Sequence, residues 1–411
     1  MLKVISFINR YIDLFFFSSL LLCLLLIQIN IDPIWPFIWI LVFLCGFKVF
    51  TEFEIIKPYK IIIILLSLFI LSQVISSLLS DSPRISLFVI RRTYILFVVF
   101  FSTFLLMKNL EQFRFILISL LTFTAIISTY ELVLYFENLP YTDLPIEFYR
   151  IDFFGHPNAI SAIKTMVILI IIPILLTKEK FLKNKFIYII LTVPIFAAIY
   201  FCNSRGNYIA ISVALIFIGW IKSKRFMVGY IVFVFLLLQF GDSAFVKRPK
   251  SIADINHPNN ISRLIMWETG FRIAKDNLIF GIGNIDARDI YRKYKKLEYN
   301  NEGINFHSIS INMLVKLGVS GLLIWTILMI YIFMKQIQIY KKTKPNIHLN
   351  NLALTSLSSM IAFQVNGITE WSLGLLEYMV IVFFNIGLCF FAYKMFIQEK
   401  NHPSSPLTGI E

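Results

Sequence analysis

The sequence predicts an all-α polytopic membrane protein with about twelve transmembrane helices. Of its 411 residues, 58% are apolar or aromatic and only 15% are charged, whereas a soluble domain is about 45–50% apolar and about 25% charged. The mean hydropathy is +0.77, and the apolar residues gather in runs of the length that a helix needs to cross a bilayer. A soluble enzyme is therefore excluded.

Twelve apolar runs divide the chain, and each predicts one membrane-spanning helix. They cover 11–29, 34–50, 61–79, 86–107, 115–136, 157–176, 186–202, 206–220, 226–240, 308–334, 351–369 and 374–393. The first run lacks a small-residue cleavage site, which favours a retained helix over a signal peptide. Residues 1–240 thus hold nine predicted helices and 308–396 hold three. The segment 241–307 is the one long loop, and 397–411 is expected to form a cytoplasmic tail that is disordered from 401 onward.

The basic residues predict which side of the membrane each connection faces. Alternate short connections carry two to four Lys or Arg each, whereas the intervening ones together carry only Arg84, Arg150 and Arg205. Because positively charged loops stay in the cytoplasm, both termini are expected there. The loop 241–307 then faces the periplasm, so the net charge of +14 does not indicate nucleic-acid binding, and basic residues of the loop could attract an anionic substrate instead.

The long loop is expected to contain short amphipathic helices that lie on the membrane-embedded body. Ser262 can cap such a helix, and the Gly-Ile-Gly at 281–283 is expected to close it. Its apolar residues would share one face: Leu264, Trp267, Phe271 and Ala274.

Cysteine and histidine spacings give no support for a metal or a disulfide framework. Each of the four cysteines lies within or beside an apolar run: Cys23, Cys45, Cys202 and Cys389. The five histidines show no His-Glu-x-x-His or comparable spacing. No metal and no other cofactor is expected.

Three residues on the predicted periplasmic side are the strongest candidates for chemistry. Arg205 lies in a short turn, where its guanidinium offers a fork of donors suited to phosphate; the alternative is an arginine that snorkels at a helix end. Arg263 opens the expected loop helix, where free N–H groups and the helix dipole favour an anion, although a solvated arginine is the alternative. His307 ends the loop and is a candidate general base, the alternative being a structural histidine.

Weaker candidates for substrate binding lie nearby. Arg150, His156 and Asn158 precede or open the sixth predicted helix, where turn chemistry alone also explains the pattern; the Asn-His-Pro-Asn at 256–259 is interpreted as recurrence of the same turn.

Other charged residues lie inside predicted helices or in the short turns between them. Arg91 and Arg92, inside the fourth predicted helix, and Glu370, in the turn after the eleventh, are further weak candidates for substrate binding. Arg91 and Arg92 could line the same cavity, or Arg84, Arg91 and Arg92 could snorkel outward, and Glu370 is a candidate ion-pair partner for one of these arginines. Lys164 and Lys316 lie inside predicted helices, where a charge needs a partner or a task.

Four short motifs occur in a fixed order between about 150 and 325. They are Gly-His-Pro-Asn-Ala at 155–159, Ser-Arg-Gly at 204–206, Arg-x-x-x-Trp at 263–267 with Phe-Gly-Ile-Gly at 280–283, and His307 with two downstream glycines, Gly318 and Gly321. Together with the long loop before the tenth predicted helix, they resemble the O-antigen ligase and polymerase superfamily of bacterial inner-membrane glycosyltransferases. Ser308 and Ile311 depart from that family's His-Asn-x-x-Leu pattern, and the first 140 residues match only as apolar spans.

The resemblance implies a metal-free glycosyl transfer from an undecaprenyl-diphosphate-linked glycan, with the site facing the periplasm and the lipid tail among the helices. Arg205 and Arg263 would hold the diphosphate, and His307 would take the proton of the acceptor hydroxyl, with inversion at the anomeric carbon. A ligase would use lipid A-core oligosaccharide as acceptor, and a polymerase another lipid-linked repeat unit. The ligase is favoured because the loop and the His307 region resemble ligases more closely.

Two other classes fit less well. Protein-glycosylating oligosaccharyltransferases of this superfamily usually carry a longer C-terminal region. A flippase or transporter would commonly show matching halves, and here the two halves do not match.

Overall fold

The computed structural model describes residues 2–29, 34–51, 59–143, 145, 149–178, 181–241, 243–298 and 305–401. Within these ranges the protein is all-helical and has no strand. The helices are α1 Leu2–Leu26, α2 Trp35–Thr51, α4 Lys60–Leu78, α5 Pro83–Leu106, α6 Leu110–Asn138, η3 Leu139–Tyr141, α7 Pro157–Leu175, α8 Lys185–Phe201, α9 Arg205–Lys222, α10 Lys224–Phe240, α11 Ser243–Lys250, α12 Pro258–Asp276, α13 Arg288–Tyr294, α14 Ile309–Lys342, α15 Ile347–Thr369, η4 Ser372–Gly374 and α16 Leu376–Asn401.

Each of the twelve predicted runs coincides with one of these helices. In the described residues seven helices are long and apolar enough to cross a membrane, namely α4 to α7 and α14 to α16, and shorter apolar helices lie within α1, α2 and α8. The chain is therefore a polytopic helical protein of the membrane type, while the number of crossings and their direction stay predictions. The helix α16 runs to Asn401 and so includes the first residues of the predicted tail 397–411, of which 402–411 lie outside the described residues.

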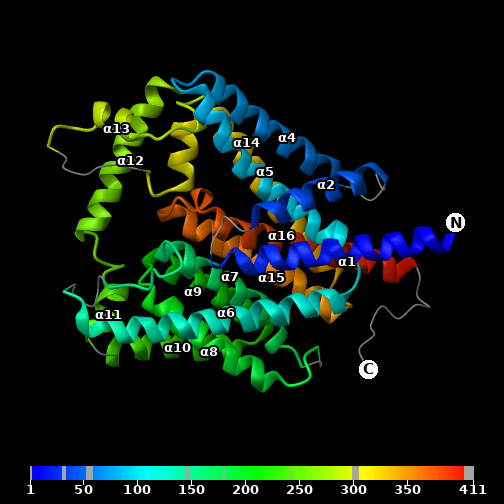
Figure 1. Ribbon diagram of the computed structural model, residues 1–411. Helices are drawn as coiled ribbons and strands as arrows, with labels where there is room; N and C mark the ends of the chain where they lie inside the picture. The colour runs from blue at the N-terminus through cyan, green and yellow to red at the C-terminus, as the bar shows by residue number, and fades with distance from the viewer. Residues whose placement is uncertain are drawn as a thin grey trace.

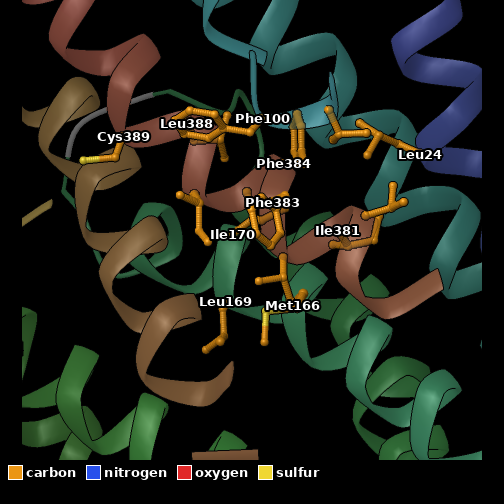
Figure 2. Close-up of a cluster of buried hydrophobic side chains, with 14 of the residues drawn as sticks. Leu24, Phe100, Met166, Leu169, Ile170, Ile381, Phe383, Phe384, Leu388 and Cys389 are labelled. Carbon is orange, nitrogen blue, oxygen red and sulfur yellow. The ribbon is translucent and has the colours of Figure 1, made fainter. Parts of the chain in front are cut away.

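The core lies where α7, α15 and α16 meet. Every residue of α7 from Ala159 to Ile174 is buried, as expected for a helix that is apolar on all sides. The helix α16 packs against α5, α7 and α15, and α15 also packs against α9 and α14. Figure 2 shows how side chains of α1, α5, α7 and α16 gather in this core, among them Met166, Phe100 and Phe383.

Buried polar contacts fix α7 against its neighbours. The ammonium of Lys164 lies 2.7 Å from a carboxylate oxygen of Glu131 on α6, and both side chains are almost fully buried. This ion pair explains the charge that Lys164 places inside a predicted span. The side-chain amide of Asn207, on α9, donates to the hydroxyls of Ser161 (2.6 Å) and Thr165 (2.8 Å) on α7. These bonds hold the first turn of α9 against the first two turns of α7.

The helices of the long loop cover one end of the bundle. Figure 1 shows α12 crossing this end from α11 to α13, whereas α1 begins and α16 ends at the opposite end. A small core joins α12 and α13 to the start of α14 and includes Ile273, Tyr291, Phe306 and Val315. The loop is therefore packed onto the bundle, as the sequence predicted.

The boundaries and the buried face of α12 differ from the prediction. The helix begins at Pro258, and the ring nitrogen Nδ1 of His257 caps it by accepting a hydrogen bond from the backbone N–H of Asn259 (3.2 Å). Ser262 therefore lies within the helix and does not begin it. Leu264 and Phe271 are more than half exposed. The buried residues are Met266, Thr269, Gly270, Ile273 and Ala274, so of the predicted apolar face only Ala274 is fully buried. A side chain larger than hydrogen at Gly270 would collide with Phe306 and Ile311.

The segment after α12 docks into a break in α14. Gly318 interrupts α14 with φ +67°, and Gly281 has the same left-handed φ. The backbone N–H groups of Ile282 and Gly283 donate to the carbonyls of Val315 (3.0 Å) and Lys316 (2.9 Å). The Gly-Ile-Gly motif was predicted to close the loop helix; instead α12 ends at Asp276 and the motif pairs with the α14 backbone. The break frees carbonyl groups of α14, and the loop satisfies them.

Candidate functional site

A carboxylate joins two of the predicted site residues. Glu370 directly follows α15 and is 6% exposed. Its oxygen Oε1 accepts a hydrogen bond from Nη2 of Arg263 at 2.7 Å, and its oxygen Oε2 lies 3.2 Å from Nδ1 of His307. Glu370 was expected to pair with Arg91, Arg92 or Arg84, and its partner is Arg263 instead.

The charge of Glu370 follows from these two partners. Burial raises the pKa of its carboxyl, but the hydrogen bond from His307 and the positive charge of Arg263 outweigh burial and hold the pKa below its usual range. The group is therefore an anion at neutral pH and can only accept hydrogen bonds. Consequently, Nδ1 of His307 must carry the proton in this contact, which leaves Nε2 of the ring as the basic nitrogen.

The local sequence holds His307 in an uncommon backbone conformation. Its φ is +43°, a left-handed value that costs free energy in residues other than glycine. The side chain of Asn305 accepts a hydrogen bond from the His307 N–H at 3.0 Å, and the indole of Trp267 donates to the carbonyl of Phe306 at 2.8 Å. Its contact with Glu370 holds the ring at Nδ1. The side chain is about one-third exposed, so the rest of the ring is accessible.

Four arginines gather beside the pair and are called here the arginine cluster: Arg150, Arg205, Arg248 and Arg263. Arg205 is the first residue of α9, is 6% exposed, and donates weakly to the Ser251 carbonyl at 3.3 Å. Arg248, on α11, donates to the Asn203 carbonyl at 3.3 Å.

The electrostatics of the cluster indicate a site for an anion. Burial, and then the charges of Arg150 and Arg205, lower the pKa of Arg248 to about 10. Burial likewise lowers the pKa of Arg150, whose guanidinium makes no hydrogen bond within the part of the chain that the structure describes. Four cations thus share a small region with Glu370, whose charge is already engaged by Arg263 and His307. Buried like charges are costly without a counter-ion, so the cluster is suited to a polyanion such as a diphosphate.

The position of Arg263 changes one part of the sequence interpretation. It is the sixth residue of α12 rather than the first, so the free N–H groups of the helix N-terminus do not assist it. Its suitability for an anion comes instead from the other three arginines of the cluster, whereas its contact with Glu370 already offsets part of its own charge.

His156 and Asn158 form a helix cap near the cluster. The backbone N–H of Asn158 donates to Nδ1 of His156 at 3.2 Å, which caps α7. His257 and Asn259 make the same cap on α12. The repeated His-Pro-Asn, interpreted from the sequence as a recurring turn, is therefore a turn that begins a helix in both places. Burial lowers the pKa of His156, and the nearby charges of Arg150 and His307 also lower it.

Arg91 and Arg92 line two different cavities. The guanidinium carbon of Arg91 lies 3.4 Å from the ring centroid of Phe88, and Arg91 borders an apolar cavity of about 720 Å³ between α2, α4 and α5. Arg92 borders a second cavity of about 300 Å³, together with Lys316 and Trp371. The two adjacent arginines therefore do not line one common cavity, because successive helix residues point in different directions.

Arg248 was missed in the sequence. It lies in Lys-Arg-Pro-Lys at 247–250, a run that has the composition of a solvated loop and gives no sign that one member is buried. Only the packing of α11 beside α9 brings it to Arg205.

No metal site is evident in the described ranges, because they contain no group of three or more His, Cys, Asp or Glu positioned to hold an ion. The four cysteines are buried free thiols. The expectation that the protein needs no metal stays a prediction.

The fold and the site together define a class of protein. It is a polytopic helical membrane protein in which a cluster of arginines suited to bind an anion lies beside a histidine–carboxylate pair. Residues 190–326 match the family model for O-antigen ligase. The matched segment is a third of the chain and contains Arg205, Arg248, Arg263 and His307, and it confirms the resemblance to the O-antigen ligase superfamily. No curated protein matches the chain. A function of the ligase or polymerase type follows from the family match.

Proposed function

We propose that the protein is an O-antigen ligase, which transfers O-antigen polysaccharide from undecaprenyl diphosphate to lipid A-core oligosaccharide in lipopolysaccharide biosynthesis. The reaction takes place on the periplasmic face of the inner membrane. The observation that carries this proposal is the arginine cluster beside the His307–Glu370 pair. Three of the four arginines, and His307 of the pair, lie in the segment that matches the family model.

The arginine cluster holds the diphosphate of the donor. Guanidinium groups bind phosphate oxygens through two parallel hydrogen bonds, and Arg150 has all of its donors available for this purpose. As the bond between the sugar and the diphosphate breaks, negative charge grows on the leaving oxygen, and fixed cations stabilise that charge. The arginines therefore supply the positive charge that the leaving group requires, and the proposed reaction is independent of metal.

His307 activates the acceptor. Its Nε2 takes the proton from a hydroxyl of the acceptor sugar as that oxygen attacks the anomeric carbon of the donor. The new carbon–oxygen bond forms as the bond to the diphosphate breaks, and undecaprenyl diphosphate leaves with the electron pair. Glu370 stabilises the imidazolium that forms, and the imidazolium later releases the proton from Nε2 to solvent. Because the displacement is a single step, the configuration at the anomeric carbon inverts.

The decisive experiment compares lipopolysaccharide on gels from a deletion strain that carries the wild-type gene or the His307→Ala variant at matched expression. Free core with accumulated long lipid-linked polymer in the variant supports a ligase, whereas core capped by a single repeat unit identifies a polymerase. Unchanged lipopolysaccharide contradicts both. His348→Ala is the matched control, because His348 begins α15 at the end opposite Glu370 and should leave the gel pattern of the wild type.

A further inference from the structure

A second cavity adjoins the proposed catalytic pair. We call it the Lys316 pocket; it has a volume of about 300 Å³ and lies between α4, α5, α14 and the segment after α12. Its polar lining consists of Gln73, Arg92, Thr93, Asn284, Asp286, Asn305 and Lys316. The lining includes none of the arginine cluster, so the pocket is separate from the proposed diphosphate site.

The charge of the pocket is positive. Arg92 and Lys316 both border it, and the ammonium of Lys316 lies 5.5 Å from the ring centroid of Trp371. The one carboxylate in the lining, Asp286, already accepts a hydrogen bond from Nε of Arg288 at 2.8 Å. Arg288, which does not line the cavity, thus neutralises the charge of Asp286. The positive charges of Arg92 and Lys316 remain, and they favour an anionic ligand.

A buried donor in the pocket lacks an acceptor. Gln73, on α4, is 4% exposed. Its oxygen accepts hydrogen bonds from Thr93 (3.1 Å) and Asn284 (3.3 Å), which fixes the amide group. Its nitrogen Nε2 has no partner among the residues that the structure describes. A buried N–H without an acceptor costs free energy, so an oxygen of a bound molecule would satisfy it.

The pocket lies next to the residues that would activate an acceptor hydroxyl. Asn305 borders the pocket and accepts the hydrogen bond from the His307 N–H. Trp371 also borders it and directly follows Glu370 in the chain. The arginine cluster approaches the same pair through Arg263. The pair therefore contacts the proposed donor site and has neighbours in the Lys316 pocket.

We infer that the Lys316 pocket binds the acceptor sugar and that this sugar carries an anionic group, either a carboxylate or a phosphate. The acceptor role rests on the proposed function. Tryptophan rings offer a flat apolar surface to a sugar ring, the amides of Gln73 and Asn284 recognise its hydroxyls, and the two cations bind the acidic group.

Binding of soluble sugars tests the pocket without any transfer reaction. The full chain in lipid nanodiscs is titrated with galacturonic acid, glucose 6-phosphate and glucose. Saturation-transfer NMR is expected to show that at least one acidic sugar binds about tenfold more tightly than glucose, as charge-assisted hydrogen bonds are stronger than neutral ones. Galacturonic acid alone indicates a carboxylate, and glucose 6-phosphate alone indicates a phosphate. Equal binding of all three sugars overturns the inference.

Matched variants locate the bound sugar. Arg92→Gln and Lys316→Gln should each weaken acidic-sugar binding about tenfold, while diphosphate binding stays unchanged and shows that the protein is folded. Arg91→Gln is the control, because the neighbouring Arg91 stacks on Phe88 and faces the other cavity. Equal weakening by Arg91→Gln and Arg92→Gln would overturn the assignment to this pocket.

Transfer kinetics separate this inference from the proposed function. In an active wild type, Arg92→Gln should raise the KM for the acceptor about tenfold and leave kcat within about twofold. An unchanged acceptor KM overturns the acceptor role and leaves the ligase proposal standing. A wild type that transfers nothing overturns the ligase proposal and the acceptor role together, and the sugar titration then decides by itself whether the pocket prefers acidic sugars.

Discussion

Nδ1 of His307 lies 3.2 Å from Oε2 of Glu370, although the two residues are 63 positions apart in the chain. The second oxygen of the same carboxylate lies 2.7 Å from Nη2 of Arg263. One buried carboxylate therefore orients the proposed base and also touches the proposed diphosphate site. This arrangement has the logic of a catalytic triad, in which a carboxylate fixes the tautomer of a histidine, and it gives Glu370 a more specific role than the substrate binding first expected.

His307→Ala should lower kcat for glycan transfer about 10²- to 10⁴-fold, because it removes the general base. Donor binding should survive, since the arginine cluster is untouched. Steady-state transfer with purified protein measures kcat, and titration with inorganic diphosphate measures the donor site. Activity equal to that of the wild type would remove His307 from the mechanism.

Glu370→Gln should lower kcat by as much as about 10⁴-fold, as the same carboxylate-to-amide change does in a Ser-His-Asp triad, where it leaves the histidine in the wrong tautomer. The amide keeps the size of the side chain but loses the charge that holds the proton on Nδ1. Transfer rates of Glu370→Gln and Glu370→Asp distinguish orientation from packing. If Gln at this position supports the full rate, the carboxylate has no role in orienting the base.

The contacts of Glu370 also predict a pH dependence of stability. Its pKa is lower in the folded protein than in the unfolded chain, so its stabilising contribution is complete above the ordinary carboxyl pKa of about 4.3. The contribution is lost as the pH falls through the lower, folded-state pKa. The difference in thermal midpoint between wild type and Glu370→Gln should therefore shrink from pH 6 to pH 3. A constant difference across this range would contradict the assignment.

Arg248→Lys and Arg205→Lys should each raise the KM for the donor about tenfold or more. Lysine keeps the charge but cannot form the two parallel hydrogen bonds of a guanidinium. Arg272→Lys is the control, because Arg272 is 40% exposed and pairs with Glu268 on the surface of α12. Donor KM values at fixed ionic strength provide the measurement, and equal effects of all three substitutions would refute a specific diphosphate site.

The helical architecture could be predicted because it depends on the length and hydrophobicity of individual segments. Each apolar run of sufficient length gave a helix, and the order of short motifs around Arg205, Arg263 and His307 indicated the resemblance that the family match of residues 190–326 supports. The face of α12 could not be predicted in this way. Its buried side is set by the small residue Gly270 facing Phe306, so the contact depends on shape complementarity between distant segments and not on the hydrophobicity of α12 itself.

The same limit applies to the site. Arg248 lies within a run of loop charges, and only the placement of α11 buries it. Arg91 and Arg92 are adjacent in the sequence, yet their side chains border different cavities. The sequence offers no explanation for the charge of Lys316, whereas in the fold this residue lines the pocket between α4, α5 and α14. Side chains acquire these roles through the tertiary arrangement, which a single sequence does not specify residue by residue.

Gly318→Ala should destabilise the protein by about 1–3 kcal/mol or more, because alanine would adopt an unfavourable left-handed φ there. Its Cβ would also clash with the carbonyl oxygen of Ile279 in the docked segment. Gly229→Ala is the control, since nothing lies within 4 Å of a Cβ at that position of α10 and alanine is favoured in helices. Thermal unfolding in detergent compares the two variants, and a similar midpoint for both would show that the break in α14 does not require glycine.

Lys164→Met should destabilise the protein by about 3–5 kcal/mol, since it leaves the carboxylate of Glu131 buried without its partner. The side chains are 4% and 0% exposed, so water cannot replace the lost contact. The double variant Lys164→Met with Glu131→Leu should recover most of the loss, because no charge is then buried and well-packed apolar residues can replace a buried ion pair. A double-mutant cycle of thermal stability measures the coupling. If the two single losses simply add in the double variant, the ion pair does not couple α6 to α7, and the charge of Lys164 needs another explanation.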